Sequence, residues 1–220
     1  MIRYFVTVGL IFFIADLFGQ QVRFGLEGSP GIGYYFDSNN TPGVKSEPKF
    51  NYAVGGKAII QLKDSVLFLE TGFQYQQRGS KQTGIPLVTE KVDINIDHAF
   101  YAIPLLIRVE FSNWFLTVGP TFEKYIETRY FDAINGKKRA IEFPPFGKIY
   151  SDKLGFEFNA GYNINLFKGV SFCPHLNYNM GRFYRFKQSN QTGFVYNIEA
   201  GFTLLYGFNW KKPPIEQPKF

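Results

Sequence analysis

The chain has 220 residues, of which 19% are charged and 45% hydrophobic, and its formal net charge is +6. These values exclude an intrinsically disordered chain and a long charged helical rod. Cys173 is the single cysteine, so an internal disulfide framework and a multi-cysteine zinc site are also excluded. Aromatic residues reach 19%, with 26 Phe and 14 Tyr, which is the most unusual feature of the composition.

Residues 1–20 predict a secretory signal peptide. Arg3 provides a short positive region, and residues 4–14 form an almost unbroken apolar run before Asp16. This run is shorter than the roughly 20 residues of a transmembrane helix. We expect cleavage near Gly19 or Gln20. The alternative is a buried N-terminal helix.

Hydrophobic and polar residues then alternate along the rest of the chain. In residues 154–166, Leu154, Phe156 and Phe158 share one face, while Glu157 and Asn159 lie on the other. This period of two is that of a β-strand, and no segment shows a convincing helical period. The pattern predicts eight strands, near 22–36, 50–62, 66–78, 98–110, 114–126, 154–166, 170–184 and 193–208.

The predicted connections alternate in length. Short ones, at 63–65, 111–113 and 167–169, separate long ones at roughly 37–49, 79–97, 127–153 and 185–192. Transmembrane barrels have such an order, with tight periplasmic turns and long outer loops. Four prolines fall within the predicted strands, where we expect bulges or strand ends, because proline removes a donor from the ladder: Pro30, Pro104, Pro120 and Pro174.

Two features indicate that the apolar face points outward, into lipid. Aromatic residues gather at both ends of the strands, as in the two interfacial girdles of a membrane barrel. We assign Tyr34, Tyr35, Phe36, Phe100, Tyr101, Tyr125, Phe183, Tyr184, Phe194 and Tyr196 to the loop side, and Phe111, Trp114, Phe172, Phe208 and Trp210 to the turn side. The polar face carries charged side chains, and placing a charged side chain in hydrocarbon costs several kcal/mol of free energy, roughly 2.5–3.5 for each on insertion scales.

The predicted fold is therefore all-β, an eight-stranded antiparallel up-and-down transmembrane β-barrel in the cell outer membrane. It covers residues 21–210, and a proline-rich tail, 211–220, extends into the periplasm. The alternative is a soluble lipocalin-like barrel whose apolar face surrounds a ligand.

The charged residues of the polar face are predicted to form a network inside the barrel. They are Arg23, Glu27, Lys57, Glu70, Arg108, Glu110, Glu123, Glu157 and Glu199. Because eight strands enclose an interior that side chains just fill, we expect a network that locks the barrel rather than a pore. Crowded carboxylates could instead support general acid chemistry. No cofactor or metal site is predicted.

The loops contain basic residues that would face the phosphates of lipopolysaccharide. These are Lys137, Lys138, Arg139, Arg182, Arg185 and Lys187. We therefore expect contact with outer-membrane lipid and lipopolysaccharide, together with a periplasmic or outer-membrane protein partner. Nucleic acid is not an expected partner of an exported barrel.

The mature chain resembles the PorT-like outer-membrane β-barrel family of Bacteroidetes-type bacteria. The resemblance rests on residues 101–108 (Tyr-Ala-Ile-Pro-Leu-Leu-Ile-Arg), residues 69–75 with Arg78-Gly79, and residues 118–120. It implies a small outer-membrane barrel in which a proline at position 104 is tolerated. Only the namesake members are tied to secretion and gliding machinery, so that role does not transfer to this chain.

We predict a non-catalytic structural or protein-interaction role, accessory to secretion or cell-surface assembly. The sequence contains no Walker loop, no His-Glu-x-x-His and no Gly-x-Ser-x-Gly motif. The alternative is a lipid-modifying barrel enzyme, for which His98, expected at the rim, with Asp97 is the candidate pair. Cys173 and His175 share a face and could form a nucleophile and base, but lumen packing is the favoured interpretation.

Overall fold

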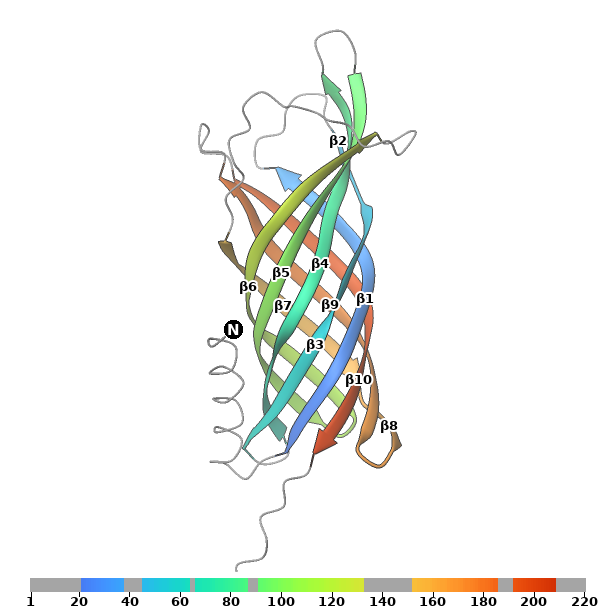
Figure 1. The fold of residues 1–220 in the computed structure, drawn as a ribbon, viewed down its shortest axis with the longest axis vertical. Coiled ribbons are helices and arrows are strands. Elements are labelled where there is room, and N and C mark those ends of the chain that lie inside the picture. The colour runs from blue at the N-terminus through green and yellow to red at the C-terminus, as the bar shows by residue number, and fades with distance from the viewer. Residues whose placement is uncertain are drawn as a thin grey trace, which may run out of the picture.

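The computed structural model describes residues 21–37, 45–63, 66–86, 91–132, 152–185 and 192–208. This part of the chain forms ten strands (Figure 1). They are β1 (Val22–Asp37), β2 (Lys45–Glu47), β3 (Lys49–Lys63), β4 (Leu67–Pro86), β5 (Lys91–Phe111), β6 (Trp114–Asp132), β7 (Asp152–Tyr162), β8 (Ile164–Phe167), β9 (Val170–Arg185) and β10 (Thr192–Phe208). No helix in these ranges is long and apolar enough to cross a membrane. The predicted signal peptide and the tail at 211–220 lie outside the described residues.

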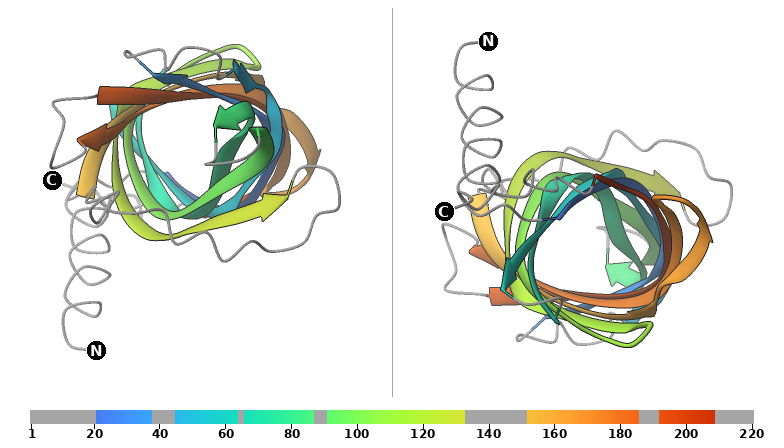
Figure 2. Two further views of the ribbon diagram at one scale, coloured as in Figure 1. Left: turned by 90° about the horizontal axis from the view of Figure 1, so that it is seen from above. Right: turned by 90° about the horizontal axis from the view of Figure 1, so that it is seen from below.

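The strands close into an antiparallel ring. Its order is β1, β3, β4, β5, β6, β7, β9 and β10, and the pairing of β10 with β1 closes it. Figure 2 shows this ring from both ends. The short strand β8 continues β7, and β2 pairs only with β4, so the ring has eight members. The predicted fold class is confirmed.

Proline accounts for the break between β7 and β8. Gly161 pairs with His175 and Ile164 pairs with Phe172 in the same register, which places Tyr162 opposite Pro174. Because proline has no N–H group, the ladder is interrupted there. The strand end expected near this proline is therefore present, but on the neighbouring strand.

The expectation of bulges or strand ends is wrong for the other three prolines. β1, β5 and β6 run through Pro30, Pro104 and Pro120 without a register shift at any of them. A residue in an antiparallel strand donates its N–H to one neighbour only, so proline removes one ladder bond and leaves the other side paired. Pro30 remains opposite Tyr52 of β3, although the β1–β10 pairing omits it.

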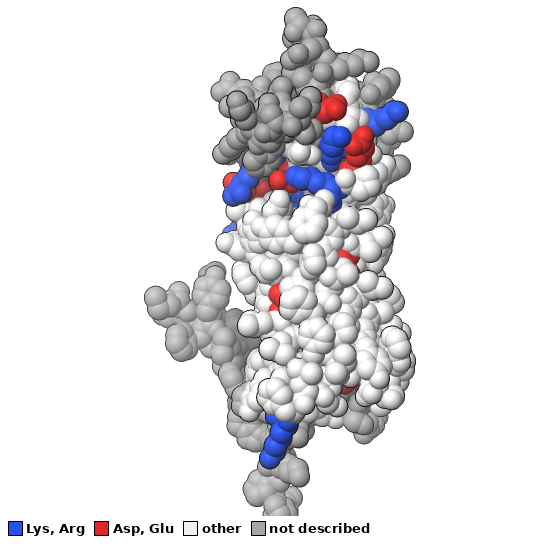
Figure 3. All heavy atoms as spheres, turned by 90° about the vertical axis from the view of Figure 1, so that its right-hand side faces the viewer, with Lys and Arg blue, Asp and Glu red and all other residues white. Residues whose placement is uncertain are grey.

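The alternation of the sequence becomes an apolar exterior and a polar interior. Leu26, Phe50 and Leu176 are 71%, 64% and 62% exposed, whereas Glu70, Glu157 and Asn159 are fully buried. The outer surface carries few charged atoms over its middle, and charged residues gather at one end (Figure 3). This orientation contradicts the soluble lipocalin-like alternative, in which the apolar face would line the interior.

Strands β4, β5 and β6 extend well beyond the region predicted for them. Residues 79–97 were expected to form a long loop, but β4 continues to Pro86 and β5 begins at Lys91. The paired segment projects past the end of the ring (Figure 1). Alternation is weak in residues 79–86 of β4, which explains why this strand was not predicted that far. Residues 92–97 of β5 do alternate, and Ile94 on their apolar face is fully buried, so this strand signal was present in the sequence and was overlooked. We call residues 79–86 of β4, 91–98 of β5 and 125–132 of β6 the strand extension.

The opposite end of the barrel has tight turns. Ser112 (φ 56°) and Gly169 (φ 79°) adopt left-handed conformations in the turns at 112–113 and 168–169. Both ends of the described chain, at residues 21 and 208, lie at this end. Short turns mark the periplasmic side of outer-membrane barrels, so the strand extension points outward from the cell.

Candidate functional site

The interior of the barrel contains all nine residues of the predicted lumen charge network. Eight of them are buried, and Glu110 has a side chain only 11% exposed. They come from β1, β3, β4, β5, β6, β7 and β10, because every second residue of each strand points inward. The strand period thus gathers residues far apart in sequence into one enclosed cluster.

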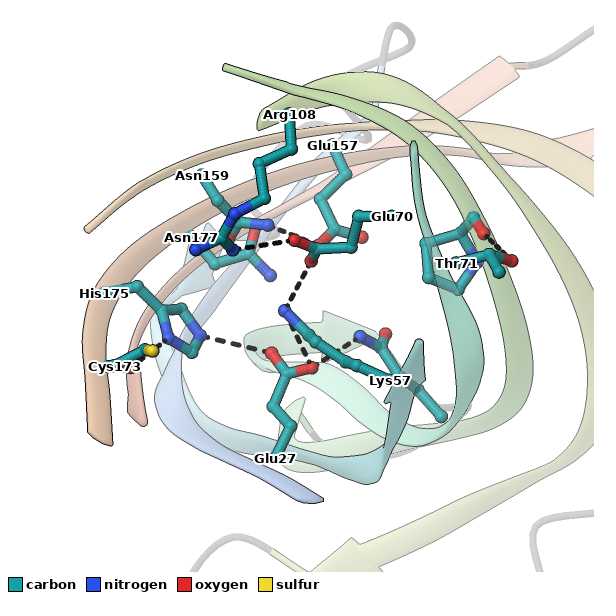
Figure 4. A network of polar contacts seen from close by, with 12 residues as sticks. Glu27, Lys57, Glu70, Thr71, Arg108, Glu157, Asn159, Cys173, His175 and Asn177 are labelled. Atoms are coloured by element: carbon teal, nitrogen blue, oxygen red, sulfur yellow. Dashed lines mark hydrogen bonds and ion pairs between the residues drawn. The ribbon is translucent and has the colours of Figure 1, made fainter. Parts of the chain in front are cut away.

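Lys57 and Arg108 share the carboxylate of Glu70 at the centre of this cluster (Figure 4). Lys57 Nζ lies 2.8 Å from Glu70 Oε1, and Arg108 Nη1 lies 2.9 Å from Glu70 Oε2. Lys57 Nζ is also 3.1 Å from Glu27 Oε2. Each of these side chains is at most 4% exposed. Such pairing is what makes buried charge tolerable.

The network continues toward the turn end. Glu110 Oε1 accepts hydrogen bonds from Arg108 Nε at 2.7 Å and from Arg23 Nη2 at 2.8 Å. An apolar cluster packs beside these groups at the same level of the lumen, consisting of Ile59, Phe68, Phe115, Cys173 and Leu205. The guanidinium groups of Arg23 and Arg108 lie over the Phe68 and Phe115 rings, 4.6 and 3.6 Å from their centroids, which are cation–π contacts.

The network also continues toward the strand extension, through residues that the sequence interpretation missed. Gln74 donates to Glu27 at 3.0 Å, and Gln76 donates to Gln74 at 2.6 Å. Arg78 donates to Gln76, and its Nη1 lies 2.6 Å from Glu123 Oε1. The missed residues are separated from Glu70 by even numbers of positions on the same strand. The even spacing between Glu70 and Arg78 was therefore the sequence signal that Arg78 is a fourth cation of the lumen.

Cys173 and His175 do not form a nucleophile and base. His175 Nε2 lies 3.1 Å from Glu27 Oε1, and its Nδ1 lies 3.1 Å from the backbone carbonyl of Cys173. The thiol of Cys173 instead contacts Asn163 Oδ1 at 3.2 Å. Both side chains are enclosed, so this geometry is the lumen packing favoured from the sequence.

Asp97 and His98 do not combine into a catalytic pair either. Asp97 forms an ion pair with Lys49, and successive residues of a strand point to opposite faces. His98 was expected at the exposed rim, but it is buried and lies opposite Arg78 of β4. His98 lies within the sheet and not at its end, because β4 and β5 continue past this point.

Glu157 and Glu199 differ from the other four lumen carboxylates, because no ion pair with a cation is formed by either in the described part of the chain. Glu157 accepts hydrogen bonds from Thr121 at 3.2 Å and Asn159 at 2.9 Å. Glu199 accepts one from Asn177 at 3.2 Å. Among the described residues, no group of three or more His, Cys, Asp and Glu side chains is placed to hold a metal.

The strand extension carries ion pairs at its surface, while Ile94 of β5 is fully buried. Lys81 Nζ lies 2.9 Å from Glu47 Oε2 of β2, and Arg129 pairs with Glu127. The hydrogen bond and charge of Glu47 raise the pKa of Lys81. The pairing of β6 with β7 stops at Lys124 and Asp152, while β6 continues along β5 to Asp132. One edge of β6 therefore runs beyond its neighbour in the described sheet.

Most residues predicted to contact lipopolysaccharide cannot be placed. Lys137, Lys138, Arg139 and Lys187 lie outside the described residues. Arg182 and Arg185 belong to the end of β9 near the strand extension, with only their backbone described.

The exterior agrees with a membrane-spanning barrel, with two corrections to the predicted aromatic girdles among the described residues. Tyr34 and Tyr101 are exposed on the loop side, and Phe111 and Trp114 are exposed on the turn side. Phe100 was assigned to the outer girdle but is 1% exposed, because it continues the inward-facing set of β5 to which Ala102 and Leu106 belong. Tyr125 was assigned there too, but it lies opposite Phe100 on β6 and its ring contacts the Phe100 ring, so it faces inward as well. A closed antiparallel barrel with an apolar outer band and interfacial aromatics is an outer-membrane barrel.

No family model matches the chain, and no curated protein matches its sequence. Solved structures with a similar arrangement include neisserial surface protein A (10% identity, 82% of this chain and 96% of that chain, TM-score 0.44). OprG from Pseudomonas aeruginosa is 12% identical over 86% of this chain and 95% of that one, with a TM-score of 0.47. The outer membrane protease OmpT from Escherichia coli is 10% identical over 86% and 97%, with a TM-score of 0.40. Structural similarities at 10–12% identity carry no information about the activity of this chain.

Proposed function

We propose that the chain is a non-catalytic outer-membrane barrel with a structural or protein-interaction role, accessory to secretion or cell-surface assembly. The observation that carries the proposal is the strand extension, which projects past the apolar band and leaves an edge of β6 beyond its pairing with β7. Sheet edges present backbone donors and acceptors that can pair with an extended segment of another protein.

The filled lumen supports the same proposal. Ion pairs from Arg23 to Glu123, and the apolar cluster beside those at the turn end, occupy the interior, as expected for eight strands. A barrel packed in this way is poorly suited to conduct solutes, and neither candidate pair, Cys173 with His175 or Asp97 with His98, is assembled. Interaction through the exposed end remains the role that the geometry favours.

Two narrower assignments belong to the proposal. We assign the chain to the PorT-like family on the Ile103-Pro104-Leu105-Leu106 segment, which runs through β5 without a register shift at the proline. We also assign the basic residues near the outer end, including Arg182 and Arg185 of β9, to contacts with lipopolysaccharide phosphates.

A photo-crosslinking amino acid at Arg129, which is exposed on β6, tests the interaction role in intact cells. We expect an adduct with a specific protein, identified by mass spectrometry. Because Lys81 and Asn95 are paired across β4 and β5, joining them by an Asn-Gly turn in place of residues 82–94 shortens the extension without disturbing the ring. This shortened variant should lose the adduct.

The same crosslinking residue at Lys168, in the tight turn at the other end, provides the control. Heat-modifiable migration on a gel checks that each variant is a folded barrel. Equal adducts from both positions, an adduct that survives shortening, or no adduct from Arg129 in a folded barrel would each contradict the proposal.

A further inference from the structure

The lumen contains fewer positive than negative charges. Its carboxylates are Glu27, Glu70, Glu110, Glu123, Glu157 and Glu199, and its cations are Arg23, Lys57, Arg78 and Arg108. With His175 neutral, four positive and six negative charges leave a formal charge of −2. The adjacent Lys49–Asp97 pair is neutral and does not change this sum. Two carboxylates therefore require compensation from outside the described network.

The two carboxylates without an ion pair lie in one block of β7, β9 and β10. Glu157 lies opposite Asn179, which lies opposite Asn197. In the next inward-facing row, Asn159 lies opposite Asn177, which lies opposite Glu199. Directly opposite side chains have Cβ atoms about 4.5–5.5 Å apart. The block thus places two carboxylates and four amides side by side, and the charges of Glu157 and Glu199 interact.

The amides of this block have oxygen atoms without a hydrogen-bond partner. Oδ1 of Asn159, Asn177 and Asn179 is buried and unpartnered, as is Nδ2 of Asn179. These three side chains are at most 2% exposed. The hydroxyl of Thr117, opposite Asn159, is likewise buried and unpartnered. A buried polar atom left in this state costs roughly 1–3 kcal/mol, so several in one place indicate that enclosed water or an ion satisfies them.

We propose that this block binds one small hard cation, with Glu157 and Glu199 as the charged ligands and the amide oxygens of Asn159, Asn177 and Asn179 completing the shell. Oxygen-only ligands with two carboxylates suit calcium, which accepts six to eight oxygens in flexible geometry. Magnesium requires near-ideal octahedral geometry and binds less well to such a shell. A divalent ion also supplies the two positive charges that the lumen lacks.

Calcium binding is tested on the full chain refolded in a zwitterionic detergent free of lipopolysaccharide. Calcium chloride or EDTA is present from the start of refolding, because the site is enclosed. Equilibrium dialysis with radioactive calcium should find about one ion per barrel. The thermal unfolding midpoint should be about 5–10 °C higher with calcium at a hundredfold excess over its dissociation constant than with EDTA.

The double variant Glu157→Gln with Glu199→Gln distinguishes a lumen that binds a cation from a lumen that is polar but binds none. It should bind no calcium and show no shift with calcium, yet be more stable than the wild type in EDTA, because two uncompensated charges are gone. Glu47→Gln, at an exposed ion pair, should retain the full effect of calcium and controls for surface binding.

Absence of bound calcium in the wild type would overturn the proposal, and so would a stoichiometry that the double variant leaves unchanged. If the wild type binds no calcium, protons and not a cation neutralise Glu157 and Glu199. The dialysis result on the wild type is decisive even if the double variant fails to refold. The outcome is independent of the interaction role, which depends on the strand extension of β4, β5 and β6.

Discussion

Replacing Glu70 by glutamine should destabilise the barrel by about 3–5 kcal/mol, the usual cost of breaking a buried ion pair. Glu70 is fully buried and is the shared partner of Lys57 and Arg108. The substitution removes one negative charge from beside two enclosed cations, while the shape of the side chain is nearly preserved. Urea unfolding in detergent micelles, followed by tryptophan fluorescence, measures the change.

Glu47→Gln is the matched control for this prediction. It removes the same charge from an ion pair of similar length, but its partner Lys81 lies in the exposed strand extension. Water solvates both groups there, so we expect no measurable shift of the unfolding midpoint. If Glu70→Gln were as mild as Glu47→Gln, the lumen network would not hold the barrel together.

Leu176→Arg should cost about 2–4 kcal/mol, because it places a cation against the middle of the hydrocarbon layer. Leu176 is 62% exposed near the middle of the apolar outer band of β9. The free energy of unfolding in phospholipid vesicles measures the effect, since detergent adapts to a charged surface more readily than a bilayer does.

Leu166→Arg provides the depth control, because Leu166 is 52% exposed on β8, beside the turn at 168–169. Near the interface the expected cost falls to about 0–1 kcal/mol. Equal costs at the two positions, or a harmless Leu176→Arg, would show that the apolar band does not lie in the bilayer.

The strand period in the sequence was sufficient to predict the ring and the orientation of its faces. Leu154, Phe156 and Glu157 alternate so regularly that the strand and its outward face follow directly. The reason is physical: lipid and an enclosed polar lumen impose opposite demands on successive side chains. Residues 79–86 of β4 lack this alternation, so the sequence did not distinguish strand from loop there, whereas the alternation of residues 92–97 of β5 was present and was overlooked.

Some of the remaining differences arise from the pairing of distant strands, which local patterns do not encode. The break at Asn163 depends on Pro174 of another strand, whereas the inward orientation of Phe100 follows from the alternation of β5 itself and was overlooked. Arg78 lay just at the end of its predicted strand, although its parity with Glu70 places it in the lumen. The unpartnered amides of Asn159, Asn177 and Asn179 become visible as one block only when β7 and β9 are paired.

Contacts between acyl chains and methyl groups of β6 test the orientation of the barrel most directly. Leu116 and Val118 point outward on this strand, and the buried Thr117 and Thr121 point inward, so all four positions carry a methyl group without any substitution. In lipid nanodiscs, nuclear Overhauser effects from acyl methylenes should reach Leu116 and Val118 and be absent at Thr117 and Thr121. Effects at the two threonines, with none at Leu116 and Val118, would contradict a barrel with its apolar face toward lipid.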